Sequence, residues 1–333
     1  MNIVVLGSGG WGTALALLLE KNKNQVTLWS HDPQKAVQLC LERENPLLKN
    51  VRLPDALAIT SDLSCLREAE MVVFASPSVA LRAVAREAAA DLPAGIPLVS
   101  VTKGIERGTH LRMTQIITQE TGGTHPIAAL SGPSHAEEVA RFLPTGVVAA
   151  SNDAGLAELV QRVFTNDRFR VYTHDDVVGV ELAGALKNVA ALCCGVSDGI
   201  GLGDNTKALL ITRAMAETSR LAERLGGRRE TLAGLAGMGD LIVTCTSMHS
   251  RNHRAGIAIG QGRTPQEVVA DMGGVVEGYY AAVSAHELST SLGVEMPICE
   301  AMYDILYHGA DVEGMVSRLM NRAPKRESEN NWD

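Results

Sequence analysis

The first dozen residues of the chain restrict its fold more than any other segment. Residues 2–6, Asn-Ile-Val-Val-Leu, form a short apolar run that leads directly into the glycine-rich segment 7–12, Gly-Ser-Gly-Gly-Trp-Gly, and helix formers follow. This order of strand, glycine turn and helix is the context in which the pattern G-x-G-x-x-G predicts dinucleotide binding. We expect Gly7 to allow the tight turn, Gly9 to admit a pyrophosphate next to the backbone, and Gly12 to let the helix pack against the strand. The alternative is a glycine-rich turn that binds no ligand.

The length and charge of the chain narrow the classes of protein to which it can belong. Its 333 residues favour two domains, and an apolar share of 46% is enough for a sizeable core. The formal net charge of −8 argues against a nucleic-acid partner and against a membrane-surface protein. No apolar stretch suggests a membrane span or a signal peptide, and the six cysteines form no C-x-x-C pair. We therefore expect a cytoplasmic protein with reduced thiols.

The first half of the chain alternates apolar strand signals with helix signals. Pro33 follows Asp32, a pair that is typical of a helix start with the aspartate as N-cap. Continuous apolar strands separated by helices predict a mostly parallel sheet with helices on both faces, which is a Rossmann-type doubly wound α/β domain. In such sheets ligands bind beyond the carboxyl ends of the strands. Further strands are predicted at residues 25–29, 71–75, 97–102, 127–130, 146–150 and 169–172.

The pattern becomes helical in the second half. From Val177 onward there is no convincing strand, and long alanine-rich helices are expected over 181–196 and 208–225. Thr264 and Glu267 form a capping box, so another helix starts there. We expect the active site in the cleft between the two domains. The predicted organisation is a dinucleotide-binding domain over 1–175, an all-α substrate-binding domain over 176–322 and a disordered polar tail over 323–333.

Lys187 is the best candidate for acid–base chemistry. A ketone that is reduced by a hydride needs a proton donor for the developing alkoxide. Lys187 lies inside the predicted helix 181–196, and its neighbours one turn away are small, which leaves room for a ligand. Burial would lower the pKa of Lys187 toward the working range of a catalytic acid, whereas the alternative is a surface lysine on an alanine-rich helix. The small neighbours are Ala183, Gly184 and Ala191.

Two polar clusters further along the chain add candidate ligand-binding side chains. Asp240 follows two glycines and opens an apolar run, so it is either an N-cap or a carboxylate that holds Lys187 in place. Ser250, Arg251 and Asn252 bring a hydroxyl, a guanidinium and an amide side by side. This trio suits a phosphate, because arginine offers forked donors. Its alternative is a solvated polar loop.

Two further candidates lie at the predicted carboxyl ends of strands. Lys103 follows one strand, and Ser134 follows the next one at Gly132-Pro133. Ser134 stands three residues before Glu137, so a capping box explains it without a ligand, although a capped helix end at the cleft is also an anion site. The nine histidines have no H-E-x-x-H spacing, and we expect no metal.

Taken together, the motifs resemble the bacterial type of NAD(P)-dependent sn-glycerol-3-phosphate dehydrogenase, in order over nearly the whole chain. That family has a dinucleotide-binding domain and a helical domain and is usually dimeric. It reduces dihydroxyacetone phosphate to sn-glycerol 3-phosphate for phospholipid synthesis. The motifs are 7–14 (Gly-Ser-Gly-Gly-Trp-Gly-Thr-Ala), 102–104 (Thr-Lys-Gly), 130–134 (Leu-Ser-Gly-Pro-Ser), 186–188 (Leu-Lys-Asn), 197–199 (Ser-Asp-Gly), 239–241 (Gly-Asp-Leu) with Thr244, and 250–252 (Ser-Arg-Asn).

The resemblance also implies roles for individual residues. Lys187 matches the family's proton donor and acceptor, and Trp11 stands where the family often has tyrosine or phenylalanine. The positions that match substrate contacts are Lys103, Gly132, Ser134, Lys187, Asn188, Asp240, Thr244, Ser250, Arg251 and Asn252. The positions that match cofactor contacts are Gly7, Gly9, Gly10, Trp11, Gly12, His31, Lys103, Ala136, Arg251, Val275 and Glu277.

The end of the second strand leaves the choice between NAD and NADP open. An NAD-selective site usually has an acid there, about twenty residues beyond the glycines. Asp32 is close enough to bind the ribose, but it is also the expected helix cap, and Ser30 and His31 could accept a 2′-phosphate instead. The resemblance favours NADPH, with some use of NADH.

Two other functions fit parts of the pattern. A β-hydroxyacid or 6-phosphogluconate-type dehydrogenase shares the fold order and a helical-domain lysine followed by asparagine, but it does not predict the segment 250–252 beside Asp240. An NAD(P)-sensing module without turnover has no need for Lys103, Lys187 and Asp240 to converge. The leading prediction is therefore a homodimeric dehydrogenase that acts on a small phosphate ester.

Overall fold

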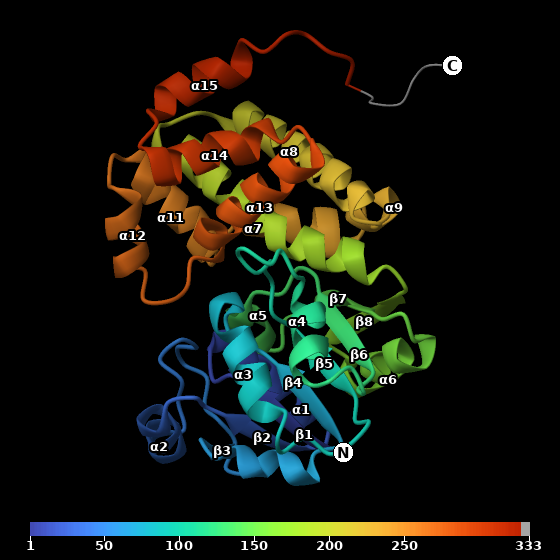
Figure 1. The fold of residues 1–333 in the computed structure, drawn as a ribbon. Coiled ribbons are helices and arrows are strands. Elements are labelled where there is room, and N and C mark those ends of the chain that lie inside the picture. Colours follow the sequence, from blue (N-terminus) through green and yellow to red (C-terminus); the bar gives the residue numbers. More distant parts are fainter. Residues whose placement is uncertain (328–333) are drawn as a thin grey trace.

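Eight strands form one sheet in the computed structural model, which describes residues 1–327 (Figure 1). They are β1 (Asn2–Leu6), β2 (Gln25–Trp29), β3 (Ala58–Thr60), β4 (Met71–Phe74), β5 (Leu98–Ser100), β6 (Ile127–Ser131), β7 (Thr145–Ala150) and β8 (Phe169–His174). Their order is β3-β2-β1-β4-β5-β6-β7-β8, and every neighbouring pair is parallel except β6 with β7. The mostly parallel sheet is therefore confirmed.

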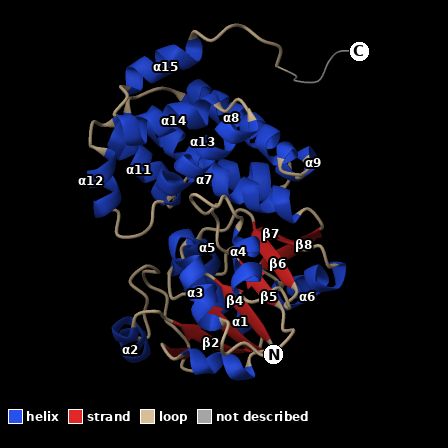
Figure 2. Ribbon diagram, in the orientation of Figure 1, coloured by secondary structure: helices blue, strands red, loops and turns tan. Residues whose placement is uncertain are grey.

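Helices cover both faces of this sheet (Figure 2). They are α1 (Gly10–Lys21), α2 (Pro33–Glu42), α3 (Leu81–Ala88), α4 (Met113–Glu120), α5 (Ala136–Ala140) and α6 (Ala154–Phe164), with short 3-10 helices η1 (Leu63–Glu68) and η2 (Ser78–Ala80). The side chains of β1 alternate between two apolar cores. Ile3 and Val5 join the core beneath α1 and α6, whereas Val4 and Leu6 join the core beneath α3 and α4. This alternation is what a doubly wound sheet requires.

The second half of the described chain is helical, as expected. Its elements are α7 (Val177–Gly199), α8 (Asp204–Arg224), α9 (Arg229–Leu232), a π-helical turn η3 (Leu235–Gly239), α10 (Asp240–Thr246), α11 (Arg251–Gly260), α12 (Pro265–Asp271), α13 (Glu277–Leu292), α14 (Pro297–His308) and α15 (Val312–Met320). The helices predicted over 181–196 and 208–225 correspond to α7 and α8, and the capping box at Thr264 starts α12. Residues 328–333, which belong to the predicted disordered tail 323–333, lie outside the described residues.

α7 is the central helix of the second half and borders the sheet domain (Figure 1). It is long and apolar enough to cross a membrane, contrary to the expectation from the sequence, but 89% of its apolar window is buried inside the protein. α11 approaches it closely at two glycines. A Cβ on Gly195 would lie 2.1 Å from the backbone oxygen of His253, and one on Gly199 would lie 2.4 Å from that of Ile257. α7 is therefore a core helix, and its polar side chains meet those of α11 directly.

Candidate active site

The glycine turn between β1 and α1 has the geometry that a pyrophosphate needs. Gly7 has a φ of +132°, and a Cβ there would lie 2.7 Å from the backbone oxygen of Ala75. A Cβ on Gly12 would lie 1.9 Å from the backbone oxygen of Gly7, so only glycine lets α1 pack this close to β1. Gly9 is the N-cap of α1, and a Cβ there would meet nothing within 4 Å. The space next to Gly9, at the start of α1, is thus free of other protein atoms, and the turn fits a dinucleotide.

Two lysines share one buried carboxylate where the sheet domain meets the helices. Nζ of Lys187, on α7, lies 2.5 Å from Oδ1 of Asp240 and 2.7 Å from Oγ1 of Thr244. Nζ of Lys103 lies 2.6 Å from Oδ2 of Asp240 and 3.1 Å from the backbone oxygen of Gly132. Lys103 follows β5, so this contact joins the sheet to the helical domain. Five of the predicted site residues therefore converge on one point.

Gly184 on α7 determines how Lys103 reaches this point. A Cβ on Gly184 would lie 3.5 Å from Cγ of Lys103 and 2.9 Å from Oγ of Ser131. The small residue next to Lys187 was expected to leave room for a ligand. Its space is instead taken by the side chain of Lys103, which brings a second ammonium next to Lys187.

Burial and charge oppose each other in this cluster. Burial lowers the pKa of Lys187 to about 8, although the Asp240 carboxylate opposes the shift; the Lys103 ammonium lowers it further. Burial alone would raise the pKa of Asp240, but the two ammonium groups hold it below its ordinary value. Asp240 is 0% exposed, and both lysines stabilise its charged form. A lysine with this pKa can give up and take back a proton near neutral pH.

Asp240 is not a helix N-cap. Gly239 stands at the N-cap position of α10 and already has helical angles, φ −59° and ψ −49°, because η3 runs directly into this helix. Both oxygens of the Asp240 carboxylate are bound to lysines. Of the two interpretations of this residue, the cap is wrong, and the carboxylate that holds Lys187 is the one that the geometry supports.

Asn188 and Asn252 form a second polar cluster next to Lys187. Nδ2 of Asn252 donates to Oδ1 of Asn188 at 2.9 Å, and Oδ1 of Asn252 accepts from the backbone N–H of Gly278 at 2.9 Å. Both asparagine side chains are buried. The pair thereby connects α7, α11 and the start of α13.

The segment 250–252 is the start of a helix and not a solvated loop. Ser250 is the N-cap of α11, and its hydroxyl accepts a hydrogen bond from the backbone N–H of His253. Arg251 is exposed, and a Cβ on Gly274 would lie 2.1 Å from its Nη1. The guanidinium therefore rests on the backbone of the loop before α13, where Val275 also lies, and keeps its donors available to a ligand.

The predicted capping box at Ser134 is wrong. The Ser134 hydroxyl donates to the backbone oxygen of Gly132 at 2.8 Å, and α5 begins at Ala136 with His135 in the N-cap position. The turn after β6 lets the hydroxyl bond locally, so it does not cap the helix. Ala136 lies beside the glycine turn, because a Cβ on Gly10 would be 3.7 Å from the Cβ of Ala136.

Glu277 contacts Ser78, a residue that the sequence analysis did not single out. Oε1 of Glu277 accepts a hydrogen bond from the backbone N–H of Ser78 at 3.1 Å, and Oε2 accepts one from its hydroxyl. Burial raises the pKa of Glu277, while the hydrogen bonds from Ser78 and the charge of Arg251 oppose the rise. The available signal was the segment 76–78, Ser-Pro-Ser, which follows β4 at the carboxyl edge of the sheet.

The end of β2 contains one accessible candidate for a 2′-phosphate. Oδ1 of Asp32 accepts hydrogen bonds from the first turn of α2, at 2.9 and 3.4 Å, which confirms the expected cap. Ser30 is buried, and its hydroxyl bonds to that of Ser8 at 2.8 Å, so it is turned away from solvent. His31 is exposed. Nε1 of Trp11 is buried and, within the described chain, has no hydrogen-bond partner.

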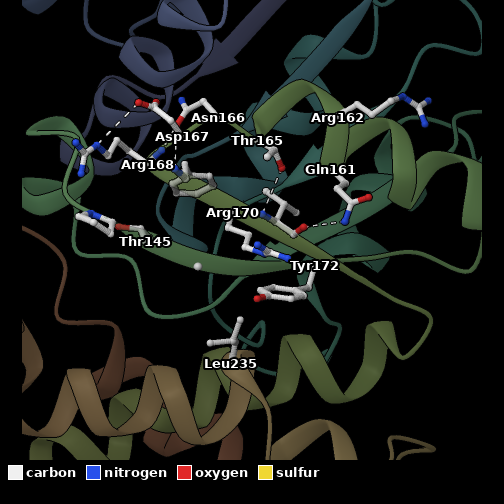
Figure 3. A pocket seen from close by; sticks show the side chains of 14 residues that line it. Thr145, Gln161, Arg162, Thr165, Asn166, Asp167, Arg168, Arg170, Tyr172 and Leu235 are labelled. Carbon is white, nitrogen blue, oxygen red and sulfur yellow. Dashed lines mark hydrogen bonds and ion pairs between the residues drawn. The ribbon is translucent and has the colours of Figure 1, made fainter.

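A groove of about 930 Å³ lies apart from these residues, between β8 and η3 (Figure 3). Arg170, Tyr172 and Leu235 line it, and the predicted site residues do not. Among residues 1–327, no group of three or more His, Cys, Asp or Glu side chains could hold a metal ion.

The doubly wound sheet, the open glycine turn and the buried lysine beside the sheet define a nucleotide-dependent dehydrogenase. The chain belongs to the NAD-dependent glycerol-3-phosphate dehydrogenase family: residues 2–157 match the model of the family's N-terminus, and residues 176–317 match that of its C-terminus. The chain is therefore an NAD(P)-dependent oxidoreductase, and the predicted family is confirmed.

Individual relatives agree with this assignment. A glycerol-3-phosphate dehydrogenase (NAD(P)+) of Chlorobium luteolum is 51% identical over 332 residues, which cover 98% of this chain and 99% of that protein. One of Geobacillus kaustophilus is 49% identical over 98% of this chain and 96% of that protein. The crystal structure of glycerol-3-phosphate dehydrogenase from Coxiella burnetii has 38% identity and a TM-score of 0.93, over 96% of this chain and 99% of that one. A ketopantoate reductase from Ralstonia eutropha, 14% identical with a TM-score of 0.62 over 96% of this chain and 100% of that one, shares the fold alone.

Proposed function

We propose that this enzyme reduces dihydroxyacetone phosphate to sn-glycerol 3-phosphate with NAD(P)H, and that Lys187 donates the proton. The observation that carries the proposal is the buried contact of Lys187 with Asp240 and Thr244, next to the pair formed by Asn188 on α7 and Asn252 on α11. The similar proteins of Chlorobium luteolum and Geobacillus kaustophilus are named for glycerol 3-phosphate and NAD(P)+.

The hydrogen bonds of Lys187 leave one of its donors for a substrate. An ammonium has three N–H groups, and Lys187 uses two of them on Asp240 and Thr244. When bound, the reduced nicotinamide supplies a hydride to the carbonyl carbon. The third N–H of Lys187 then gives its proton to the carbonyl oxygen as negative charge develops there. The amine that remains recovers a proton from solvent, which its pKa of about 8 permits near neutral pH.

The phosphate of the substrate requires a local group of donors, because the protein as a whole carries a net charge of −8. Lys187 is committed to the carbonyl end. Arg251 offers forked donors, and Asn252 adds a neutral one. The substrate contacts that we propose are Lys103, Gly132, Ser134, Lys187, Asn188, Asp240, Thr244, Ser250, Arg251 and Asn252.

The proposed cofactor site follows the carboxyl edge of the sheet. The free space next to Gly9, at the start of α1, supports a pyrophosphate contact, and the exposed His31 supports a 2′-phosphate contact. Asp32 is occupied as a helix cap, which supports a preference for NADPH over NADH. The cofactor contacts that we propose are Gly7, Gly9, Gly10, Trp11, Gly12, His31, Lys103, Ala136, Arg251, Val275 and Glu277.

We further infer a domain division at 175/176, with the cofactor domain before it and the substrate domain over 176–322. The last strand ends at His174 and α7 begins at Val177, which supports this boundary. We also infer a homodimer that supplies sn-glycerol 3-phosphate for glycerophospholipid synthesis, which agrees with the family's usual role. The six free thiols fit a reducing compartment such as the cytoplasm.

A substrate screen tests the proposal. We expect oxidation of NADPH with dihydroxyacetone phosphate and none with 2-keto acids or 3-keto acids, and reduction of NADP by sn-glycerol 3-phosphate but not by 6-phosphogluconate. Preferred turnover of a hydroxy acid would favour the β-hydroxyacid alternative. NADPH binding without turnover of any of these substrates would favour a sensing module.

A further inference from the structure

The first turn of α13 is attached to the sheet domain through Ser78. Both oxygens of Glu277 accept hydrogen bonds from Ser78, one from its backbone N–H and one from its hydroxyl, across 199 positions of sequence. Ser78 begins η2, directly beyond the carboxyl end of β4. The contact therefore crosses from the edge of the sheet where a cofactor would bind to the helical domain.

The loop that carries Lys103 packs against this contact. A Cβ on Gly104 would lie 2.5 Å from the Cβ of Ser78 and 3.8 Å from Oε2 of Glu277. Glycine is thus required directly after the lysine so that Ser78 can reach the carboxylate. The contact between Ser78 and Glu277 is therefore closely packed and lies next to the cluster of Lys103 and Asp240.

The other side of the same helical turn faces the predicted phosphate site. The backbone N–H of Gly278, one residue after Glu277, donates to Oδ1 of Asn252, and Asn252 in turn donates to Asn188. Any shift of the first turn of α13 would therefore move Asn252 and Asn188. The chain of contacts begins at Ser78 and Glu277 and passes through Gly278 and Asn252. It ends at Asn188, the residue after Lys187.

We propose that Ser78 is a positioning residue for the reaction: its hydroxyl fixes Glu277 and thereby sets the placement of Asn252 for the substrate phosphate. The inference rests on the proposed function and adds Ser78 to it. Later turns of α13 have their own attachments, from Ser284 to the backbone oxygen of Ile105 at 3.1 Å and from Glu287 to His110 at 2.8 Å. Removal of the Ser78 hydroxyl therefore loosens the first turn and leaves the helix docked.

Ser78→Ala is the test, with Ser78→Thr as the conservative rescue and Ser76→Ala as the matched control. Ser76 lies in the same turn, and within the described residues its hydroxyl has no hydrogen-bond partner. We expect Ser78→Ala to raise KM for dihydroxyacetone phosphate and Kd for NADPH by roughly tenfold, because a hydrogen bond to a charged group is lost while the backbone one remains. We expect kcat to change by less than about twofold, since no group that touches the reacting atoms is removed. Ser78→Thr should restore both constants, and Ser76→Ala should leave them unchanged.

A lower melting temperature with unchanged KM and Kd would show that Ser78 only stabilises the fold, and it would overturn the inference. Equal effects of Ser78→Ala and Ser76→Ala would also overturn it. Kd for NADPH is measured by fluorescence without turnover. If the wild-type protein failed to reduce dihydroxyacetone phosphate, the proposed function would fall, and the NADPH titrations would still decide whether Ser78 positions Glu277.

Discussion

The ammonium of Lys187 and the carboxylate of Asp240 lie 2.5 Å apart, although 53 positions of sequence separate them. Both side chains are buried. Taking each charge out of water costs several kcal/mol, so such a pair is retained only where further hydrogen bonds offset that cost. Thr244 and Lys103 provide these bonds. The arrangement sets the pKa of Lys187, which connects the packing of the domains to the proposed chemistry.

Replacement of Asp240 by asparagine tests this connection. Asp240→Asn keeps the shape and one acceptor but removes the negative charge between two ammonium groups. The pKa of Lys187 should then fall further, because burial and Lys103 both lower it and the opposing carboxylate is gone. We expect kcat for reduction at pH 7.5 to fall by about 10²-fold, with the decline of activity on the alkaline side moved to lower pH.

Glu217→Gln is the matched control for Asp240→Asn. Glu217 is also a buried carboxylate of the helical domain, but it accepts a hydrogen bond from the backbone N–H of Ile298 at 2.9 Å, and the hydrogen bonds described for residues 1–327 join it to no lysine. Its loss should leave the pH profile of kcat unchanged. If Asp240→Asn also left the profile unchanged, Asp240 would not control the proton on Lys187.

The pH dependence of the wild-type enzyme follows from the protonation of Lys187. Reduction needs the ammonium form, so kcat for reduction should decline as pH rises through about 8. Oxidation of sn-glycerol 3-phosphate needs the amine form, so its kcat should rise through the same range. Rate profiles measured in both directions between pH 6 and pH 10 would show the two opposite trends. Profiles that run in the same direction would contradict the role of Lys187.

Arg251 should contribute strongly to binding of the substrate phosphate and little to reduction of the carbonyl group. Loss of hydrogen bonds to a charged group costs about 1.5–3 kcal/mol, so Arg251→Ala should raise KM for dihydroxyacetone phosphate by roughly 10- to 100-fold. Arg251→Lys should recover only part of the loss, because an ammonium restores the positive charge but cannot make two parallel hydrogen bonds to a phosphate. Arg254→Ala, an exposed arginine one turn later on α11, is the control and should have little effect. Equal losses on dihydroxyacetone, which has no phosphate, would assign Arg251 to the cofactor or to the fold.

The cofactor preference should follow from the end of β2. Asp32 is occupied by the first turn of α2, and His31 is exposed, so kcat/KM should be higher with NADPH than with NADH. His31→Ala should reduce the value for NADPH more than that for NADH. A clear preference of the wild-type protein for NADH would mean that Asp32 binds the ribose in spite of its capping bonds.

Local patterns were sufficient to predict the parts of the fold that depend on neighbours in sequence. The glycine turn, the cap at Asp32 and the box at Thr264 are set by backbone geometry within a few residues, and each was found where expected. The long helices followed from periodicity. β3 was missed because three residues, only partly buried, give no apolar run.

The alternatives that failed concern two residues that resemble helix starts. The π-helical turn that runs into α10 and the two lysine contacts rule out an N-cap role for Asp240, and the Ser134 hydroxyl bonds locally to Gly132 in the turn after β6. The segment 76–78 marked the carboxyl edge of the sheet, but the partner of Ser78 could not be identified from the sequence, since only the fold brings Ser78 to Glu277. The convergence of Lys103 with Lys187 was predicted, but the role of Gly184 in admitting Lys103 needed the packing of α7 against the sheet.

The central claim, that Lys187 donates the proton, is tested most directly by the kcat of Lys187→Ala measured together with its affinity for NADPH. We predict that kcat for reduction of dihydroxyacetone phosphate falls by about 10²–10⁴-fold, the usual contribution of a positioned proton donor. Binding of NADPH, followed by fluorescence, should stay close to that of the wild-type protein. A variant that keeps more than about a tenth of the wild-type kcat, with an unchanged pH profile, would contradict the account.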